Sequence, residues 1–377
     1  MTRPIKVIRV IARMNVGGPA WQVSVLTRGL QPPEFETHLV CGRVADDEAD
    51  FIELRDPSLP CTYLEGLGRS VKPLDDLRAF VALVRIMRRE KPDVVHTHTA
   101  KAGVLGRSAA VVARVPYRVH TFHGHVLHGY FSPRVTKAII VIERLLARRT
   151  HVLAAVGSKV RDDLLDANIG RPEKYRVVPP GVDVVASCSK AEARLAFELP
   201  PHAPIILFVG RLTRIKRPDR LIEAMSLVLQ QRPDAILAIA GEGDLYEEVR
   251  TLAAPLGDSV RFLGWQSDLS RVYPLADTVV LTSDNEGMPV TLIEASMLGI
   301  PCVTTDVGSA HEVVLDGKTG RVVSVNSSEV ASALVDLLDD THKLGRFGSA
   351  AREHATEKFG AARLIEDYAA TYRELRT

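Results

Sequence analysis

Two glutamates stand eight positions apart in residues 283–301, SDNEGMPVTLIEASMLGIP, and both could handle a polar ligand. Pro289 suits the first turn of a helix and Gly299 suits its end, so the segment predicts a helix between them. Glu286 lies just before this helix, and Glu294 lies about one turn inside it, roughly 7 Å further along at ~1.5 Å per residue. The helix N-terminus itself attracts anions through its unpaired N–H groups. The two carboxylates are therefore either a ligand-binding or acid/base pair, or a helix cap and a satisfied polar core residue.

Two cations occupy another strand-to-helix junction, in the segment FVGRLTRIKRP at 208–218. Arg211 directly follows a predicted strand, and Lys216 comes five residues later, ahead of a predicted helix. Fixed cations near a helix N-terminus bind phosphate groups well, so this junction predicts a diphosphate site. A basic surface loop is the alternative interpretation.

Glycine-containing loops at other strand ends could bring backbone N–H groups close to a phosphate. Gly17 and Gly18 follow the first predicted strand, and Gly241 lies in the segment AGEGD at 240–244. AGEGD lacks the complete G-x-G-x-x-G spacing of a dinucleotide site, so it is weak evidence for one. A tight turn explains Gly17 and Gly18 equally well.

Histidines gather in HTHTAKAG at 96–103 and in HTFHGHVLHG at 120–129, and they look like metal ligands at first sight. Carboxylates at ligand spacing are missing beside them, so we expect no metal site. His98 and His123 are instead candidates for contacts with a substrate, and ordinary packing is the alternative for both.

Strand-like and helix-like segments alternate along the whole chain, which predicts an α/β protein with doubly wound parallel sheets. The first half has strand patterns at 5–12, 37–42, 93–98, 117–124, 151–157 and 175–183, and helical patterns at 21–30, 74–90, 102–114, 133–149 and 158–168. The second half has strand patterns at 204–210, 235–241, 260–264, 278–283, 301–305 and 320–324, and helical patterns at 217–231, 244–255 and 267–275. Residues 184–203 contain no strand pattern, and 360–375 form a strongly amphipathic last helix.

Length and composition favour two globular domains in one chain of 377 residues. The four cysteines are far apart and contain no C-x-x-C motif, which favours reduced thiols in a cytoplasmic protein. Charges interrupt the apolar stretch at the N-terminus, so it is no signal peptide, and no window of 18 apolar residues occurs.

Charge is distributed unevenly between the two halves of the chain. Residues 1–185 carry 28 Lys and Arg against 19 Asp and Glu, whereas the remainder carries 20 against 27. The basic residues cluster at 84–91 and 143–149, both amphipathic in pattern, which indicates either an anionic partner such as a membrane surface or solvated helix faces. Lys101 and Arg107 could meet an acceptor phosphate or lie on a helix surface.

Taken in order, these motifs resemble the retaining glycosyltransferases of family 4, which have the GT-B fold. The matching stretches cover almost the whole chain; they are the N-terminal GG loop, HTHTAKAGVLGR, FHGH, VPPGVD, VGRLTRIKRPDRLIEA, AGEGDL and SDNEGMPVTLIEASMLGIPCVTTDVG. The resemblance implies two Rossmann-like domains facing a central cleft. We expect an N-terminal acceptor domain at 1–185, a connector at 186–203, a donor domain at 204–358, and a C-terminal helix at 359–377 that crosses back to the first domain.

The resemblance also implies a role for each matching residue. Glu294 would bind the ribose hydroxyls of a nucleotide sugar, and Glu286 would bind the transferred hexose. Arg211 and Lys216 would hold the diphosphate, and together with Glu286 and His123 they form the implied catalytic set. Further donor contacts would come from Gly17, Gly18, Gly210, Gly241, Gly264, Gly287, Met288 and Pro289, and acceptor contacts from His98, Lys101 and His123. No metal and no cofactor are expected, since the two cations can stabilise the leaving diphosphate.

We therefore expect a metal-independent transferase that moves a hexose or N-acetylhexosamine from a nucleotide sugar, UDP on frequency alone, to a glycan or lipid-linked acceptor. The basic first half places that acceptor at the cytoplasmic face of an anionic membrane, with peripheral association and no nucleic-acid partner. Three alternatives stay open: a glycoside hydrolase using the two glutamates, a GT-B nucleotide-sugar 2-epimerase, and a nucleotide-sugar-binding protein without turnover.

Overall fold

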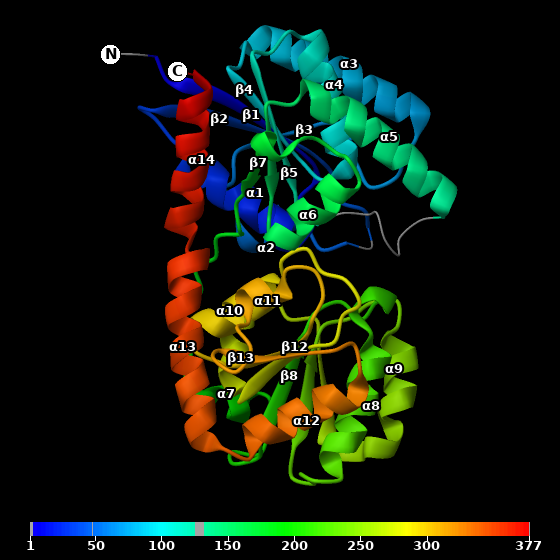
Figure 1. Ribbon diagram of the computed structural model, residues 1–377, viewed down its shortest axis with the longest axis vertical. Helices are drawn as coiled ribbons and strands as arrows, with labels where there is room; N and C mark the ends of the chain where they lie inside the picture. Colours follow the sequence, from blue (N-terminus) through cyan, green and yellow to red (C-terminus); the bar gives the residue numbers. More distant parts are fainter. Residues whose placement is uncertain (1–2, 47, 125–131, 377) are drawn as a thin grey trace. The chain divides into compact units, whose positions relative to one another are not determined.

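The computed structural model describes residues 3–46, 48–124 and 132–376 of the chain. The chain folds into two compact units (Figure 1). Unit 1 comprises Met1–Gly181 together with Ala361–Thr377, and unit 2 comprises Val182–Gly360. Each unit is built on one parallel sheet.

The sheet of unit 1 has seven strands in the order β3-β2-β1-β4-β5-β6-β7. The strands are β1 Ile5–Arg13, β2 Phe35–Gly42, β3 Cys61–Tyr63, β4 Val94–His98, β5 Tyr117–Phe122, β6 Val152–Ala155 and β7 Tyr175–Val177. The central strands are buried along their length because helices cover both faces of the sheet, as all-parallel sheets require. The strand order reverses between β1 and β4, which marks the switch point of a doubly wound sheet.

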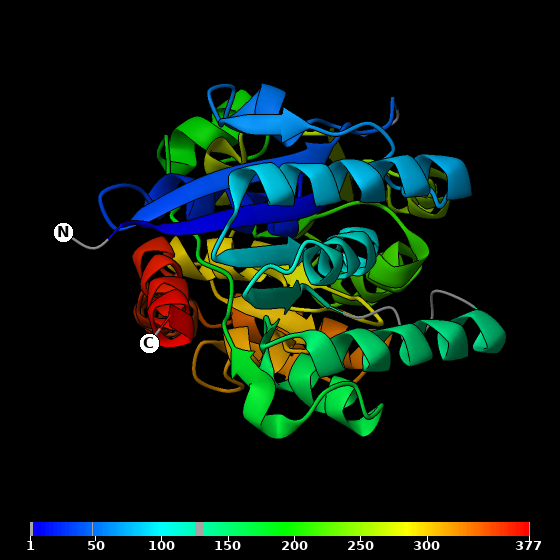
Figure 2. The same cartoon turned by 90° about the horizontal axis from the view of Figure 1, so that it is seen from above.

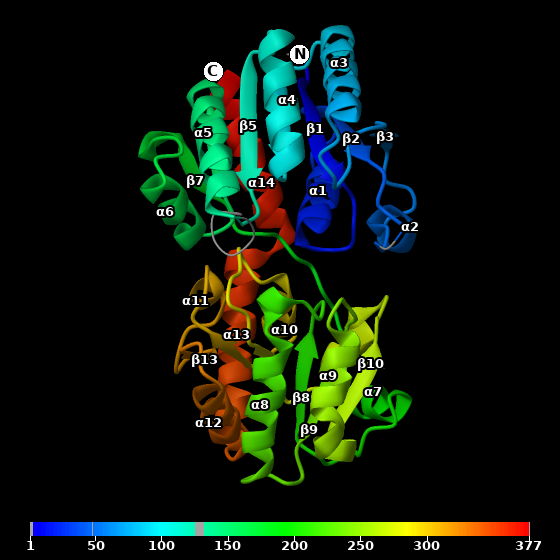
Figure 3. The ribbon, with the colours of Figure 1, turned by 90° about the vertical axis from the view of Figure 1, so that its right-hand side faces the viewer.

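The helices of unit 1 include the last helix of the described chain. They are α1 Gly18–Gly29, α2 Phe51–Arg55, α3 Pro73–Glu90, α4 Ala100–Val112, α5 Pro133–Arg149, α6 Ser158–Asp166 and α14 Ala361–Arg376. Helices α3, α4 and α5 lie side by side over one face of the sheet (Figures 2 and 3). Helix α14 packs beside α1, where Tyr368 and Tyr372 join a core that includes Ile5, Val94 and Val119.

The sheet of unit 2 has six strands in the order β10-β9-β8-β11-β12-β13. The strands are β8 Ile205–Val209, β9 Ile236–Ala240, β10 Val260–Gly264, β11 Thr278–Leu281, β12 Cys302–Thr305 and β13 Gly320–Val323. Its helices are α7 Lys190–Ala196, α8 Pro218–Leu229, α9 Tyr246–Ala253, α10 Val290–Met297, α11 Ala310–Val313, α12 Ser327–Leu338 and α13 Thr341–Phe359. Here the order reverses between β8 and β11.

The two doubly wound parallel sheets confirm the predicted fold class, but several elements differ from the sequence expectation. The predicted helix at 267–275 is wrong: Asp268 caps a 3-10 turn at Leu269–Arg271, and a second turn follows at Tyr273–Leu275. Proline at position 274 lacks the N–H that a continuous helix needs. Helix α1 begins at Gly18 rather than at Trp21.

Other elements were not predicted at all. The stretch expected to connect the domains contains α7, which Ser189 and Glu192 begin with a reciprocal capping box. The short α2 and β3 also went unpredicted, because three to five residues give too little periodicity to read. No helix in the described part of the chain is long and apolar enough to cross a membrane.

Candidate functional site

The candidate donor site of unit 2 lies where β8 and β11 end side by side. These strands pair in parallel and flank the reversal of strand order, which is the position where doubly wound sheets bind their ligands. The loop after β8 carries Arg211 and Lys216, and the loop after β11 carries Glu286. The fold therefore brings Lys216 and Glu286, 70 positions apart in the sequence, into contact and places Arg211 in the same loop as Lys216.

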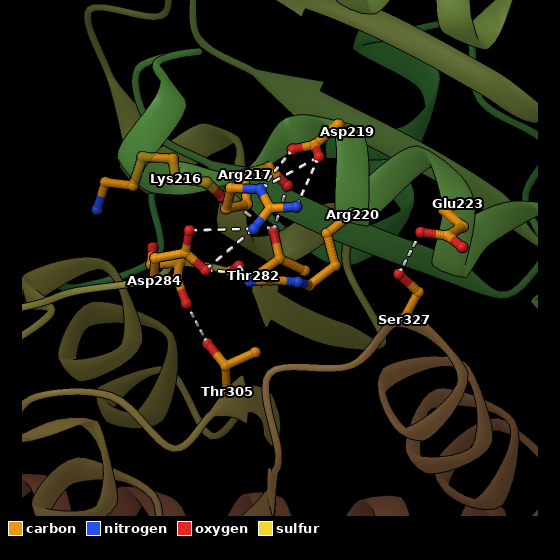
Figure 4. A network of polar contacts seen from close by, with 10 residues as sticks. Lys216, Arg217, Asp219, Arg220, Glu223, Thr282, Asp284, Thr305 and Ser327 are labelled. Atoms are coloured by element: carbon orange, nitrogen blue, oxygen red, sulfur yellow. Dashed lines mark hydrogen bonds and ion pairs between the residues drawn. The ribbon is translucent and has the colours of Figure 1, made fainter. Parts of the chain in front are cut away.

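Hydrogen bonds tie these two loops to each other. The Thr282 hydroxyl donates to the carbonyl oxygens of Lys216 and Arg217 at 3.1 and 3.2 Å. Asp284 accepts from the guanidinium groups of Arg217, at 3.0 Å, and Arg220, at 2.7 Å (Figure 4). Arg220 also donates to the Thr282 carbonyl oxygen at 2.6 Å. This network, which sequence reasoning missed, fixes the start of α8 against the end of β11.

The Lys216 side chain extends away from this network in Figure 4. It reaches the carboxylate of Glu286, which the sequence resemblance assigns to hexose binding. Its Nζ donates to Oε1 of Glu286 at 2.5 Å, and the Ser283 hydroxyl donates to the same oxygen at 2.6 Å. The Lys216 side chain is 22% exposed and that of Glu286 is 11% exposed. The pair is thus partly shielded from water, which strengthens its attraction relative to a surface ion pair.

Glu294 lies on α10, and its position is fixed by a residue from an unpredicted turn. The Tyr273 hydroxyl donates to Oε2 of Glu294 at 2.5 Å. Tyr273 is fully buried, whereas Glu294 is half-buried. Helix α10 begins after Pro289 without a side-chain cap, and Gly299 ends it at φ +74°. The predicted helix with its Pro start and Gly stop is therefore confirmed.

Glycines allow the neighbouring loops to approach closely in a way that other residues would prevent. A Cβ at Gly241 would lie 2.0 Å from the carbonyl oxygen of Gly210, and the N–H of Gly241 donates to the Gly264 carbonyl at 2.8 Å. A Cβ at Gly308, which sequence reasoning gave no role, would lie 1.7 Å from the carbonyl oxygen of Glu286. Gly308 therefore sets the position of the Glu286 backbone.

The remaining predicted donor residues lie around the same loops. Arg211 is exposed, and none of the described residues holds its guanidinium in an ion pair or hydrogen bond. Gly287 accepts a hydrogen bond from the N–H of Ser309 at 3.2 Å, and Met288 is buried. Trp265, directly after Gly264, is 41% exposed.

The predicted residues of unit 1 lie at the carboxyl ends of its own central strands. Gly17 and Gly18 stand at the uncapped start of α1, after β1. His98 ends β4, His123 follows β5, and Nδ1 of His98 lies 3.0 Å from Nε2 of His123. The structure thus brings the two histidines into direct contact. Part of the segment 120–129, namely 125–129, lies outside the described residues.

This contact favours one arrangement of the imidazole protons. Nε2 of His98 is buried and has no hydrogen-bond partner among the described residues. An unpaired buried N–H is less tolerable than an unpaired acceptor, so the proton of His98 belongs on Nδ1, where it donates to His123. His123 then carries its own proton on Nδ1. Burial lowers the pKa of His123 to about 3, so the ring is neutral at ordinary pH.

Behind this pair lies a buried polar network that sequence reasoning did not anticipate. His96 bonds the Tyr372 hydroxyl through Nδ1 at 2.6 Å and the Thr121 hydroxyl through Nε2 at 2.7 Å. Arg9 is fully buried and donates to Tyr372 at 3.4 Å. Burial and the nearby Arg9 charge hold the pKa of His96 well below its usual range. The partners on α14 are more than 270 residues away, so no local pattern could reveal them.

Lys101 and Arg107, for which acceptor contacts were considered, both have partners within unit 1. Lys101 donates to the carbonyl oxygens of Gly66 and Ser70 at 3.0 and 2.6 Å and pairs with Asp76 at 2.6 Å. Arg107 is buried rather than on a helix surface, because it binds both carboxylate oxygens of Glu143 at 2.7 and 2.8 Å.

No group of three or more potential metal-ligating side chains gathers within residues 3–46, 48–124 and 132–376.

Comparison with known proteins gives the chain its relatives. Residues 17–181 match the family described as glycosyl transferase 4-like domain, and residues 189–354 match glycosyl transferases group 1. The D-inositol 3-phosphate glycosyltransferase of Corynebacterium efficiens is 31% identical over 380 residues, covering 94% of this chain and 87% of the relative. The UDP-Gal:alpha-D-GlcNAc-diphosphoundecaprenol alpha-1,3-galactosyltransferase of Escherichia coli is 27% identical over 330 residues, covering 85% and 84%.

Among solved structures, Anabaena Alr3699/HepE in complex with UDP and glucose superimposes with a TM-score of 0.83. It is 21% identical, and the match covers 98% of this chain and all of that one. This similarity extends over both units and identifies their fold.

Proposed function

Because this chain belongs to the group 1 glycosyltransferases of family 4, which have the GT-B fold, we propose that it transfers a hexose or N-acetylhexosamine from a UDP-sugar to a glycan or lipid-linked acceptor. The E. coli relative uses UDP-galactose and a lipid-linked acceptor, and the corynebacterial relative is a D-inositol 3-phosphate glycosyltransferase. These names support a small phosphorylated or lipid-linked acceptor. The structural neighbour that contains UDP and glucose is consistent with a UDP donor.

The observation that carries the proposal is the contact of Lys216 with Glu286 at one edge of the unit 2 sheet, with Arg211 in the loop after β8 and Glu294 on α10. In this proposal Glu294 binds the ribose, the uncapped start of α10 and the two cations bind the diphosphate, and Glu286 binds the sugar. The contact of Lys216 with Glu286 supports this order, because the cation proposed for the phosphate then lies next to the carboxylate proposed for the sugar. Gly264 and Trp265 would border the base.

Charge stabilisation is the main chemistry that these residues can provide. The bond from the sugar to the diphosphate breaks, and the leaving group gains negative charge that Arg211 and Lys216 are placed to neutralise. We propose retention of the anomeric configuration by attack on the face that the diphosphate leaves, with a donor phosphate oxygen taking the acceptor proton. Neither glutamate needs to transfer a proton in this scheme.

Unit 1 would contribute acceptor contacts and part of the donor contacts. Gly17 and Gly18 would approach the diphosphate through backbone N–H groups at the start of α1. His123, with its proton on Nδ1, would act as a neutral hydrogen-bond donor to the reacting sugar. We do not extend the acceptor role to Lys101, since its donors are already occupied within unit 1.

A two-stage experiment tests the function. Thermal unfolding is first measured with UDP-, GDP- and ADP-sugars, and the true donor should add about 2.7 kcal/mol of stability at a hundred times its Kd. Release of the free nucleotide is then followed with polyprenyl-diphosphate-linked sugars, and NMR of the product reports the anomeric configuration. Donor binding without release would indicate a binding protein, and conversion of the donor sugar without any acceptor would indicate an epimerase.

A further inference from the structure

The outer face of α5 combines exposed apolar side chains with uncompensated positive charge. Val141, Ile142 and Leu145 are 47%, 43% and 56% exposed. Lys137 and Arg148 are exposed on the same helix face, which follows from the spacing of three and four residues. An apolar stripe bordered by Lys and Arg is the pattern of a helix that lies in a membrane interface.

The absence of exposed acid on this helix has a structural cause. Glu143 is the single acidic residue of α5, and it is buried against α4, where it holds Arg107. The five basic residues of α5 form no ion pair with any side chain in the described part of the chain; they are Arg134, Lys137, Arg144, Arg148 and Arg149. On the core-facing side of α5, Arg107 therefore neutralises Glu143. On the outer side, no carboxylate of α5 offsets the charge of the basic residues.

Helix α3, in the same layer of helices, also exposes apolar side chains. Helix α4 contacts both α3 and α5, so all three lie in one layer (Figure 3). On α3, Leu74 and Leu77 are 73% and 58% exposed. The acidic groups of α3 are occupied, since Asp75 pairs with Arg78 and Asp76 pairs with Lys101. Exposed apolar side chains that gather on one helix face, as on α5, mark an interaction surface.

We propose that the outer face of α5 docks on an anionic lipid surface. The positive charge of this face distinguishes between two possible partners, a second copy of the chain and an anionic bilayer. A second copy of the chain would bring two equally basic faces together around a symmetry axis, which like charges oppose. An anionic bilayer instead offers phosphate groups to the arginines and lysines and acyl chains to the apolar stripe. This inference rests on the proposed function only in naming why the enzyme would go there, to meet a lipid-linked acceptor.

The test is flotation of the whole protein with phosphatidylcholine vesicles that contain or lack phosphatidylglycerol. Binding should require the anionic lipid and weaken with added salt. The variant Lys137→Gln/Arg148→Gln should lose about 25-fold in partition coefficient, about fivefold for each charge at ~1 kcal/mol per basic residue. The variant Val141→Ser/Leu145→Ser should lose about tenfold, with the salt dependence unchanged.

Matched controls lie on unit 2. Lys318→Gln/Arg346→Gln removes two exposed charges, and Leu195→Ser removes an apolar side chain that is 81% exposed. Both should bind vesicles as the parent does. Equal losses in controls and α5 variants, or equal binding to neutral vesicles, would overturn the proposal. So would an oligomer that the apolar variant converts to monomer, because a second copy would then cover the face.

The same variants separate this inference from the proposed function. Calorimetry with UDP should give parent-like affinity for each of them, since α5 carries no predicted donor residue. If vesicle binding follows the expected pattern while no nucleotide sugar binds, the docking face stands and the transferase proposal fails. If UDP binds and the α5 substitutions leave vesicle binding unchanged, the docking face fails and the transferase proposal stands.

Discussion

The two glutamates of the proposed donor site should differ in how UDP affinity responds to the same isosteric change. Glu294→Gln removes a carboxylate from the proposed ribose contact but keeps the size of the side chain and one neutral acceptor. Hydrogen bonds to a charged group contribute about 1.5–3 kcal/mol, so losing the charge should cost about 1.5–2 kcal/mol. At about 1.4 kcal/mol per tenfold change, UDP should bind 10- to 30-fold more weakly.

Glu286→Gln should leave UDP affinity unchanged or raise it a few-fold. UDP contains ribose and diphosphate but no sugar, so it makes no use of the proposed hexose contact. The substitution also releases Lys216 from its 2.5 Å pairing with Glu286 and removes a negative charge beside the diphosphate. Affinity for the intact UDP-sugar should nevertheless fall, and turnover should fall with it.

Isothermal titration with UDP and with the donor sugar nucleotide measures both effects, with Glu248→Gln on the exposed side of α9 as the matched control. Tyr273→Phe is a milder change to the same contact, because it removes the hydroxyl that orients Glu294 but keeps the carboxylate. It should lower the affinity for UDP about fivefold. Parent-like UDP affinity in Glu294→Gln would refute the ribose contact. Equal weakening of UDP by both glutamate substitutions would place Glu286 on the nucleotide rather than on the sugar.

Three further predictions follow from contacts within each unit. Lys216→Ala should lower kcat about 10²- to 10³-fold in steady-state assays, because a cation that stabilises the leaving diphosphate is lost; a change below fivefold would contradict that role. Asp284→Asn should lower thermal stability by about 1–2 kcal/mol, because Arg217 and Arg220 lose the carboxylate that joins the loops after β8 and β11. It should also weaken UDP binding, although Asp284 is not expected to contact UDP. His98→Asn, whose amide can donate from the Nδ1 position, should keep more activity than His98→Gln, and imidazole nitrogen NMR should show His123 protonated at Nδ1 in the parent; the opposite tautomer would refute the assignment.

The candidate residues of unit 2 were easier to place from the sequence than those of unit 1. Glu286 and Glu294 belong to one continuous segment, so the Pro and Gly that bound its helix were enough to place both. The partner of Glu294 was not predictable, because Tyr273 lies 21 residues earlier in a stretch wrongly expected to be helical. The pairing of Lys216 with Glu286 depends on β8 and β11 being neighbours, which no local pattern states.

The basic residues of the first half show the limit of counting charges. Arg107 and Arg148 look alike in sequence, yet one is buried on Glu143 and the other is exposed on α5. Helical spacing places Glu143 on the face opposite Leu145, but only the packing of α4 on α5 shows which face is inside. The charge asymmetry indicated either an anionic partner or solvated helix faces, and the structure shows which basic side chains are exposed.

Because α14 belongs to unit 1, it affects the order in which the two units can finish folding during synthesis. Residues 361–376 leave the ribosome after all of residues 182–360, yet Tyr368 and Tyr372 belong to the core of the unit that begins at the N-terminus. Domains usually finish folding in the order of synthesis, the N-terminal one first. Here all residues of unit 2 are synthesised before unit 1 is complete. Until α14 is made, the buried polar network of Arg9 and His96 lacks the hydroxyl of Tyr372. A chain interrupted just before α14 would keep every predicted catalytic residue and still leave the first unit unfinished.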